Sequence, residues 1–414
     1  QLVVGEFPAF GDSQTRAIGT PDEGKTSWAE GDELLLEIDN TSYGRHNATF
    51  TYNGKSWELT SGELVYLEGD PAYISHVYYA PNYKWEAGKL VLKEGKDPGT
   101  DEYIEGKARI TGNGETITVS FAEATRKYSR LRIATLPNEQ ITVDTEYFTP
   151  AGSSDMEQNG NYTLTSDEKG NAYLYGTFEN NSEVTVKYRE AALTTYTFSQ
   201  ATESAKSYAL DATVISANSA EEIKSAIEQK VADGKTTIRL NLAPNAGTNE
   251  FMAIREAIKG AAPNDLGTIE LTIIGVETIP EEAFYKMLQL KSVRMSDVKE
   301  IKKYAFKECQ YLTVVEAPSL NKLCSGAFKK CDQLAKLTFG PINYADERNW
   351  PIFEYITPNI DLILSDYQKE MIETDSYLYT ANNDRDYAGS DEHNSKNFLG
   401  REFKSITCRR YRVE

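Results

Sequence analysis

The sequence predicts a multidomain, mainly β protein in which two β-sandwich domains precede a short α/β repeat solenoid. Three observations support this prediction. The chain has 414 residues, more than one ordinary hydrophobic core holds. Short segments of alternating hydrophobicity fill its first half, and a 22-residue repeat occupies part of its second half. The predicted sections are 1–24, 25–125, 126–214, 215–345 and 346–414.

The overall charge limits the classes of partner. The chain carries 63 acidic and 44 basic residues, a formal charge of -19, so we expect no nucleic-acid partner. It contains no run of about 18 apolar residues that would form a membrane-spanning helix. It begins at Gln1 without Met and without a signal-type apolar region. We expect an exported protein that has lost its signal and contacts a membrane only through a lipid anchor upstream of Gln1.

Residues 1–24 begin with the apolar segment QLVVGEF and continue with Gly, Pro and polar residues, which predicts a tail or a first strand. From Trp28 onward the pattern changes to short strands. ELLLEI, NATFTYNGKSWELT and AYISHVYYA lead this first β block, and the Asn53-Gly54 pair is a strong hairpin signal. A second block of strands runs from RLRIATL to KSYALDATV, with the boundary near Thr125. Strands this frequent without helices between them indicate β-sandwiches.

After Val214 helices appear for the first time. In SAEEIKSAIEQKVADG, Ser219 is a candidate N-cap with Glu222 three residues later, and Gly234 ends the helix. A strand (TTIRLNL) and a second helix (NEFMAIREAIKG) follow. This α/β segment is the candidate first cap of the repeats.

The 22-residue repeat is marked by an Ala-Phe pair that recurs at Ala283-Phe284, Ala305-Phe306 and Ala327-Phe328. Further apolar columns keep the same spacing: Ile279, Ile301 and Leu323; Met287, Cys309 and Cys331; Leu290, Leu312 and Leu334; Val293, Val315 and Leu337. A period in the low twenties predicts a leucine-rich-repeat solenoid with one short strand per repeat. Because Met and Cys share a column, the cysteines are expected to fill space rather than react. Residues 346–414 lose the period and are expected to form the second cap.

Two resemblances follow from these motifs. The repeat L-x-x-V-x-x-x-x-x-x-x-I-x-x-x-A-F-x-x-C over about 268–340 resembles the BspA-type leucine-rich repeats of bacterial surface proteins, which are often adhesins. The third repeat departs slightly, with Leu323-Cys324-Ser325 where the others have Ile-Pro or Ile-Lys.

The first half resembles the fimbrillin-like proteins of Bacteroidetes, relatives of the major and minor fimbrial subunits. The residues that carry this likeness are Thr15-Arg16-Ala17, Trp28-x-x-Gly31-Asp32, NATFTYNGKSW, NYTLTSDEKGNAYLYG and KSYALD. The resemblance implies two transthyretin-like β-sandwich domains, export as an outer-membrane lipoprotein, and polymerisation with other fimbrial subunits by strand exchange. It also makes Arg16 the candidate site of protease processing. An appended solenoid departs from the plain subunit pattern and favours a tip or surface-anchored adhesin.

No residue pattern indicates catalysis, a cofactor or a metal. The motifs G-x-S-x-G, H-E-x-x-H and G-x-G-x-x-G are absent. GTPDEGKT at 19–26 matches the P-loop pattern but lacks the strand before it and the helix after it. The acidic run 382–392 departs from the EF-hand template. We therefore expect a non-enzymatic protein with no cofactor and no metal site.

The expected function is adhesion to a protein or glycan ligand on a host or matrix surface. The candidate ligand-facing residues on the repeats lie between the apolar columns: Arg294, Ser296, Glu316 and Ser319. The aromatic stretch YYAPNYKW supplies Tyr83 and Trp85, expected to be exposed and able to stack on sugar rings. The alternative is therefore a glycan-binding surface lipoprotein of a carbohydrate-uptake system. Packing of these aromatic residues within their own domain remains open at this stage.

Overall fold

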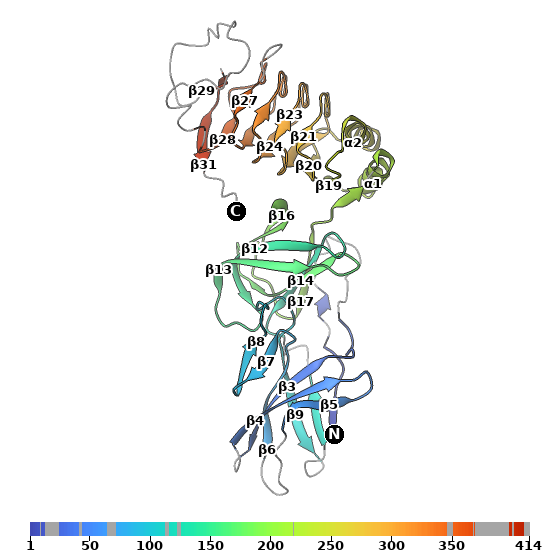
Figure 1. The fold of residues 1–414 in the computed structure, drawn as a ribbon, viewed down its shortest axis with the longest axis vertical. Coiled ribbons are helices and arrows are strands. Elements are labelled where there is room, and N and C mark those ends of the chain that lie inside the picture. Colours follow the sequence, from blue (N-terminus) through green and yellow to red (C-terminus); the bar gives the residue numbers. More distant parts are fainter. Residues whose placement is uncertain are drawn as a thin grey trace. The chain divides into compact units, whose positions relative to one another are not determined.

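The computed structural model describes residues 1–8, 10–12, 25–40, 44–63, 72–111, 116–121, 126–217, 219–345, 351–366, 368, 397–399 and 401–409. The chain divides into two compact units, which are described separately below: unit 1, Gln1–Thr213, and unit 2, Val214–Glu414 (Figure 1). The described residues are mainly β, as the sequence predicted, and they include two α-helices.

Unit 1 contains two large sheets. The first has the order β1 (Leu2–Val4), β10 (Thr116–Ser120), β9 (Ile104–Thr111), β6 (Ala72–Tyr79), β3 (Glu33–Asn40), β4 (Gly44–Tyr52), β5 (Trp57–Gly62). The second has the order β16 (Ala191–Thr197), β15 (Glu183–Tyr188), β12 (Gln140–Pro150), β14 (Asn171–Phe178), β11 (Ser129–Ala134), β17 (Lys206–Asp211), β2 (Gly11–Asp12). In addition, β13 (Glu157–Thr165) pairs with β12, and β7 (Tyr83–Glu86) forms a hairpin with β8 (Lys89–Leu92). This mainly antiparallel architecture fits the β-sandwich prediction.

The hairpin predicted at Asn53-Gly54 is confirmed. Strands β4 and β5 pair antiparallel on either side of it. The Asn53 Oδ1 atom accepts hydrogen bonds from the backbone N–H groups of Lys55 and Ser56 at 2.9 and 2.8 Å. Gly54 adopts a φ of 87°, a conformation that glycine reaches at little cost.

The N-terminal residues contribute to both sheets. Strand β1 pairs parallel with β10, and β2 pairs parallel with β17. Leu2 and Phe7 are buried, at 7% and 6% exposure. The described part of 1–12 is therefore packed into unit 1 and does not extend away as a tail. Arg16 lies outside the described residues.

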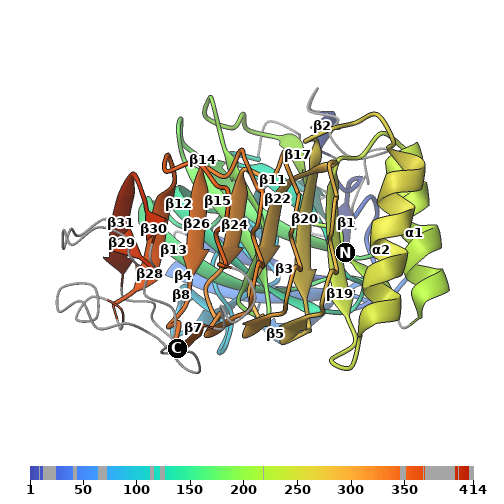
Figure 2. The same cartoon turned by 90° about the horizontal axis from the view of Figure 1, so that it is seen from above.

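Unit 2 is built on a large parallel sheet with the order β18 (Ile215–Ala217), β19 (Thr237–Leu242), β20 (Ile269–Ile274), β22 (Leu290–Met295), β24 (Val314–Ala317), β26 (Lys336–Phe339), β28 (Asp361–Ser365), β31 (Ser405–Arg409). Figure 2 shows these strands side by side, with α1 (Ala220–Ala232) and α2 (Thr248–Ala261) next to β19. The Ser219 side chain accepts a hydrogen bond from Glu222 N at 3.3 Å, which confirms the predicted helix cap.

A second parallel sheet joins β21 (Thr278–Ile279), β23 (Glu300–Ile301), β25 (Lys322–Leu323) and β27 (Tyr344–Ala345). The prediction of one strand per repeat is therefore wrong, because the Ile279, Ile301 and Leu323 column forms a backbone ladder of its own. In the large sheet Val293 pairs with Val315, 22 residues later. The loss of period after 345 is real, since Leu337 pairs with Leu362, yet strands continue there and end at β31. A short hairpin of β29 (Asn397–Phe398) and β30 (Arg401–Glu402) precedes β31.

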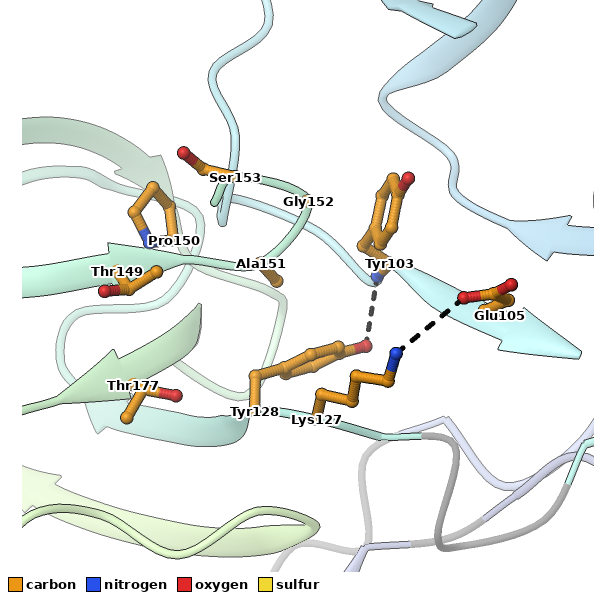
Figure 3. Close-up of a pocket in the computed structure, with 10 residues that line it drawn as sticks. All are labelled: Tyr103, Glu105, Lys127, Tyr128, Thr149, Pro150, Ala151, Gly152, Ser153 and Thr177. Atoms are coloured by element: carbon orange, nitrogen blue, oxygen red, sulfur yellow. Dashed lines mark hydrogen bonds and ion pairs between the residues drawn. The ribbon is translucent and has the colours of Figure 1, made fainter. Parts of the chain in front are cut away.

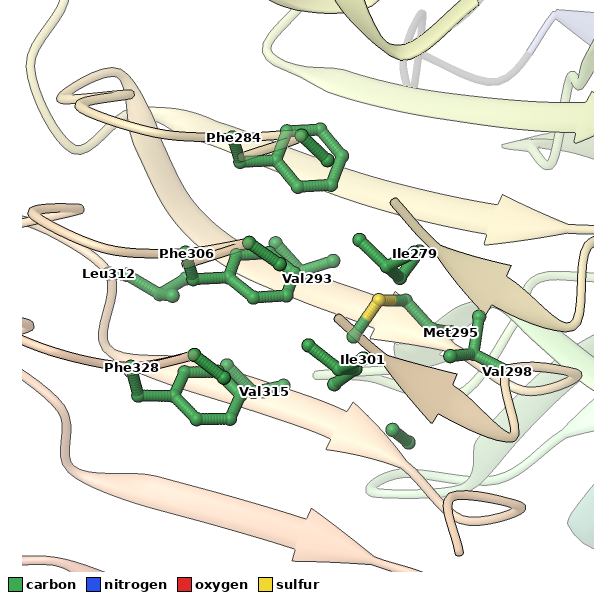
Figure 4. Close-up of a cluster of buried hydrophobic side chains, with 14 of the residues drawn as sticks. Ile279, Phe284, Val293, Met295, Val298, Ile301, Phe306, Leu312, Val315 and Phe328 are labelled. Atoms are coloured by element: carbon green, nitrogen blue, oxygen red, sulfur yellow. The ribbon is translucent and has the colours of Figure 1, made fainter. Parts of the chain in front are cut away.

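The core of unit 2 is a row of stacked phenylalanine rings, called here the phenylalanine ladder (Figure 4). Phe284 and Phe306 have ring centroids 5.1 Å apart, and Phe306 and Phe328 are 5.4 Å apart with planes inclined by only 6°. Every column predicted from the repeat is buried. The ladder continues to Phe353, 5.8 Å from Phe328, which the sequence analysis did not assign to a column.

Edge-on rings end the ladder on both sides. Phe251 of α2 packs on Phe284 at 5.6 Å, and Phe403 packs on Phe353 at 5.5 Å with the planes 89° apart. An edge-to-face contact is a favourable aromatic geometry that does not continue the stack. The helical segment and the residues before β31 thus cover the two ends of the apolar core.

The cysteine column makes hydrogen bonds as well as packing. Cys309 Sγ donates to Phe284 O at 2.9 Å, and Cys331 Sγ donates to Phe306 O at 3.0 Å. Burial raises the pKa of the Cys309 thiol to about 12 and that of Cys331 well above its ordinary value. None of the four cysteines forms a disulfide.

Phe306→Ala should lower the free energy of unfolding by about 3–5 kcal/mol, because it opens a cavity between two stacked rings. Met252→Ala is the matched control, since Met252 on α2 is 41% exposed and should change stability by less than about 0.5 kcal/mol. Urea denaturation followed by circular dichroism measures both. Equal midpoints for the two variants would contradict the role given to the ladder.

The native protein should leave Cys309 and Cys331 unmodified by a thiol reagent near pH 8, while the half-buried Cys324 and Cys408 react. The folded-state pKa of Cys309 lies above its ordinary value of 9.0, so burial of the neutral thiol stabilises the fold fully below pH 9. That stabilisation is lost as the pH rises toward 12. Mass spectrometry of the labelled peptides identifies which thiols react. Early labelling of Cys331 would refute the prediction.

Candidate functional site

A groove of about 650 Å³ lies in unit 2, where the turns after four parallel strands meet. Its walls come from the segments that follow β19, β20, β22 and β24. They are formed by Pro244, Ala246, Gly275, Val276, Glu277, Thr278, Asp297, Lys299 and Ser319. Parallel strands place the segments at their carboxyl ends on the same edge of a sheet, which explains why residues 75 positions apart line one groove.

Backbone contacts between adjacent repeats fix the shape of this groove. Gly275 N donates to Asp297 Oδ2 at 2.8 Å, and Lys299 N donates to Glu277 O at 2.8 Å. Gly275 has a φ of 88°, and a Cβ atom there would lie 2.3 Å from Leu242 O. This position accepts only glycine without movement of the backbone. The groove is therefore preformed on a rigid support.

The polar groups of the groove suit recognition by hydrogen bonds. Lys299 Nζ lies 2.5 Å from Glu277 Oε1, and both side chains are more than half exposed. Hydroxyl groups come from Thr278 and Ser319. The groove therefore presents both signs of charge together with neutral donors and acceptors, an arrangement that can orient a polar ligand.

The structure separates the four ligand-facing residues that the sequence suggested. Ser319 is exposed and lines the groove, and Ser296 is half-buried in the turn beside Asp297. Arg294 and Glu316 lie opposite each other on β22 and β24, with Nε and Oε2 3.0 Å apart. They therefore neutralise each other across the sheet. Ligand contact by any of the four stays a prediction.

Sequence reasoning missed most of the groove. Gly275, Glu277, Asp297 and Lys299 occupy the gap between the strand column and the Ile279 column. No single residue type repeats there, so a search for periodic positions passes over them. The signal that could have found them is the gap itself, because these are the positions that packing leaves unconstrained.

The exposure expected for the aromatic stretch is wrong in part. Tyr79 and Tyr83 are buried, at 3% and 8% exposure, and Trp85 is half-buried. The Tyr83 ring packs edge-on against Tyr103 at 5.0 Å. Burial, followed by the neighbouring Tyr103, raises the pKa of Tyr83 to about 12. The β7–β8 hairpin thus contributes Tyr83 to its own core, where the ring cannot stack on a sugar.

Unit 1 contains a smaller cavity of about 240 Å³ (Figure 3). It is lined by Tyr103, Glu105, Lys127, Tyr128, Thr149, Pro150, Ala151, Gly152, Ser153 and Thr177. Lys127 Nζ lies 4.0 Å from Glu105 Oε2, and Tyr103 N donates to Tyr128 Oη at 3.0 Å. These groups are already paired with one another, so the cavity presents few unused donors to a ligand.

Behind this cavity a buried ion pair holds the N-terminal segment. Arg126 and Glu102 form the pair, with side chains 1% and 4% exposed. Tyr128 Oη donates to Glu102 Oε2 at 2.7 Å, and burial raises the pKa of this tyrosine well above its usual range. Arg126 Nη2 also donates to Pro8 O at 2.6 Å, and its guanidinium lies 3.8 Å from the Phe10 ring centroid. The pair therefore fastens the first residues of the chain to unit 1.

Comparison with protein families identifies the repeats. Residues 265–369 are BspA-type leucine-rich repeats. They match the model of the BspA-type leucine-rich repeat region in six copies. The resemblance inferred from the A-F-x-x-C pattern is thus confirmed for this part of the chain, which includes β20 to β28. The fimbrillin-like resemblance of unit 1 stays a prediction.

Among solved structures, a leucine-rich repeat protein of T. pallidum is similar to this chain. The two are 18% identical, and the alignment covers 23% of this chain and 58% of that one, with a TM-score of 0.19. The match thus spans less than two thirds of that protein. No functionally curated protein matches the chain.

Other site types were searched within the described residues. No group of three or more His, Cys, Asp or Glu side chains is placed there to hold a metal ion. No helix among them is long and apolar enough to cross a membrane. The acidic run 382–392 lies outside the described residues.

Arg126→Met should lower the free energy of unfolding of unit 1 by about 3–5 kcal/mol, because it leaves the Glu102 carboxylate buried without its cation. Lys127→Met is the matched control, since Lys127 is 82% exposed and should change stability by less than about 1 kcal/mol. Trp28 fluorescence in urea reports the loss, because Trp28 packs edge-on against Phe7 at 4.9 Å. If both variants unfold at the same midpoint, the pair does not fasten the segment.

Proposed function

We propose that this protein is a cell-surface adhesion protein that binds a host or matrix ligand through its leucine-rich-repeat unit. The observation that carries the proposal is the groove in the BspA-type repeats, whose polar side chains stand on a backbone that packing holds rigid. Such repeats are common in bacterial adhesins. A preformed groove also lowers the entropy cost of binding.

A binding role fits these groups better than catalysis. General acid–base chemistry needs a group whose pKa lies near the working pH and whose proton can reach a substrate. Among the described groove residues, Lys299 pairs with Glu277, and Asp297 accepts a backbone N–H. We therefore propose a non-enzymatic protein that needs no cofactor.

In the finer proposal unit 1 is a pair of transthyretin-like β-sandwich domains, and unit 2 is a solenoid carried as a fimbrial tip, an accessory subunit or a surface-anchored adhesin. Two edge pairings support a role for the N-terminal segment in assembly: β1 lies on β10, and β2 lies on β17. Cleavage after Arg16 would release both strands. The two uncovered edges would then be open to a strand from another fimbrial subunit.

Export and a lipid anchor upstream of Gln1 belong to the same proposal. The glycan-binding alternative has less support, because Tyr83 is buried and Trp85 is half-buried. A glycan ligand of the groove would still count as adhesion.

Ser319→Arg tests the groove, because a long cationic side chain there would fill part of it. Beads coated with the full chain are applied to a panel of immobilised matrix proteins and host cells. The variant should reduce attachment at least about fivefold, which corresponds to roughly 1 kcal/mol. Gln333→Arg adds the same side chain at another exposed position of the repeats and should attach like wild type. Attachment by Ser319→Arg at the wild-type level would remove the groove from the proposal.

A further inference from the structure

A row of alternating lysine and tyrosine side chains lies on the turns that follow β21 and β23. Lys303 Nζ is 4.8 Å from the Tyr304 ring centroid, and Lys307 Nζ is 4.7 Å from the same ring. Lys307 is also 5.1 Å from the Tyr285 ring, which Lys286 approaches to 5.2 Å. We call these five residues the lysine–tyrosine row. The ring faces hold the ammonium groups in place by cation–π attraction.

The row carries more positive than negative charge. Glu308 is the carboxylate at its centre, and Lys286, Lys307 and Lys330 surround it at 3.5, 3.9 and 4.0 Å. One carboxylate is thus shared by three ammonium groups, and Lys303 stands beside them. The exposed Glu282 is the acidic residue in the neighbouring turn.

Helix α2 adds two further cations next to the row. Arg255 Nη1 donates to Glu282 O at 2.9 Å, and Lys259 Nζ donates to Tyr285 O at 3.5 Å. Burial and the nearby Arg255 lower the pKa of Lys259, and Lys286 contributes in the same direction. Positive charge therefore accumulates at this edge of unit 2.

Other exposed lysines of the repeats are neutralised pair by pair. Lys291 pairs with Glu270 at 2.7 Å, Lys299 with Glu277 at 2.5 Å, and Lys322 with Glu300 at 2.7 Å. Residues 265–340 carry 11 basic and 10 acidic residues, within a chain whose formal charge is -19. The unmatched positive charge at the row is thus a local feature and does not follow from the composition.

We propose that the lysine–tyrosine row binds a linear sulfated polysaccharide. Clustered basic side chains attract such polyanions, and a line of cations along the repeat direction matches a chain with charges at intervals. Lysine is a point charge that accepts a sulfate from many directions, whereas arginine would favour bidentate partners. The charge of -19 opposes a long nucleic acid, and the tyrosine faces are occupied by ammonium groups and cannot stack on bases. This surface is separate from the groove, so neither proposal depends on the other.

The test measures binding of the full chain to immobilised heparin as a function of salt. With three to four ionic contacts, affinity should fall roughly 20- to 150-fold between about 50 and about 200 mM NaCl, from the slopes known for polyanions. The triple variant Lys286→Gln, Lys303→Gln, Lys307→Gln should bind at least about tenfold more weakly than wild type. The corresponding triple Lys-to-Arg variant should retain binding, because it keeps the charge.

The matched control is Lys291→Gln, Lys299→Gln, Lys322→Gln, which removes the same charge from paired lysines and should leave heparin binding unchanged. If the row variant melts earlier than wild type, Lys303→Gln alone is compared and should still elute at lower salt. Fully desulfated heparin should not bind. The proposal is overturned by absent heparin binding at low salt, by equal losses in the two triple variants, or by equally tight binding of polyglutamate or a single-stranded oligonucleotide.

Discussion

The stacking of one phenylalanine per repeat is the interaction on which the rest of unit 2 depends. The ring centroids in the ladder are 5.1 to 5.8 Å apart, close to the spacing of about 4.8 Å between adjacent strands. Ring stacking and backbone pairing therefore favour the same register. A shift of one residue would break both at once, because every ring would leave its column. Turn residues can then vary while their backbone stays in place.

Backbone conformation connects this core to the surface. Two positions in each repeat have positive φ, and one of them is occupied successively by Lys286, Glu308 and Lys330, at 55°, 63° and 59°. Such conformations cost of order 1 kcal/mol or more for non-glycine residues and persist where surrounding contacts enforce them. The backbone bonds from Lys286 N to Lys307 O and from Glu308 N to Lys329 O are such contacts. The central charges of the row thus stand on positions that the core determines.

The sequence was informative where packing repeats and silent where it does not. The columns, the capped helix at Ser219 and the Asn53-Gly54 hairpin each depend on contacts close in sequence or on strict spacing, so pattern reasoning found them. Phe353 escaped because it follows Phe328 by 25 residues, which breaks the 22-residue register. The burial of Tyr83 and the convergence of the groove residues depend on which strands become neighbours, and local sequence does not encode that pairing.

The constant offset in the large sheet has a consequence for how this gene segment can change over time. Because each repeat contacts its neighbours through the same ring, ladder and cysteine positions, recombination that inserts or deletes one complete 22-residue block preserves every contact. An insertion of any other length would misalign all later rings. Each added block would move the distal cap outward by about 4.8 Å, one strand spacing. Copy number could therefore tune the reach of the binding surface without altering its architecture.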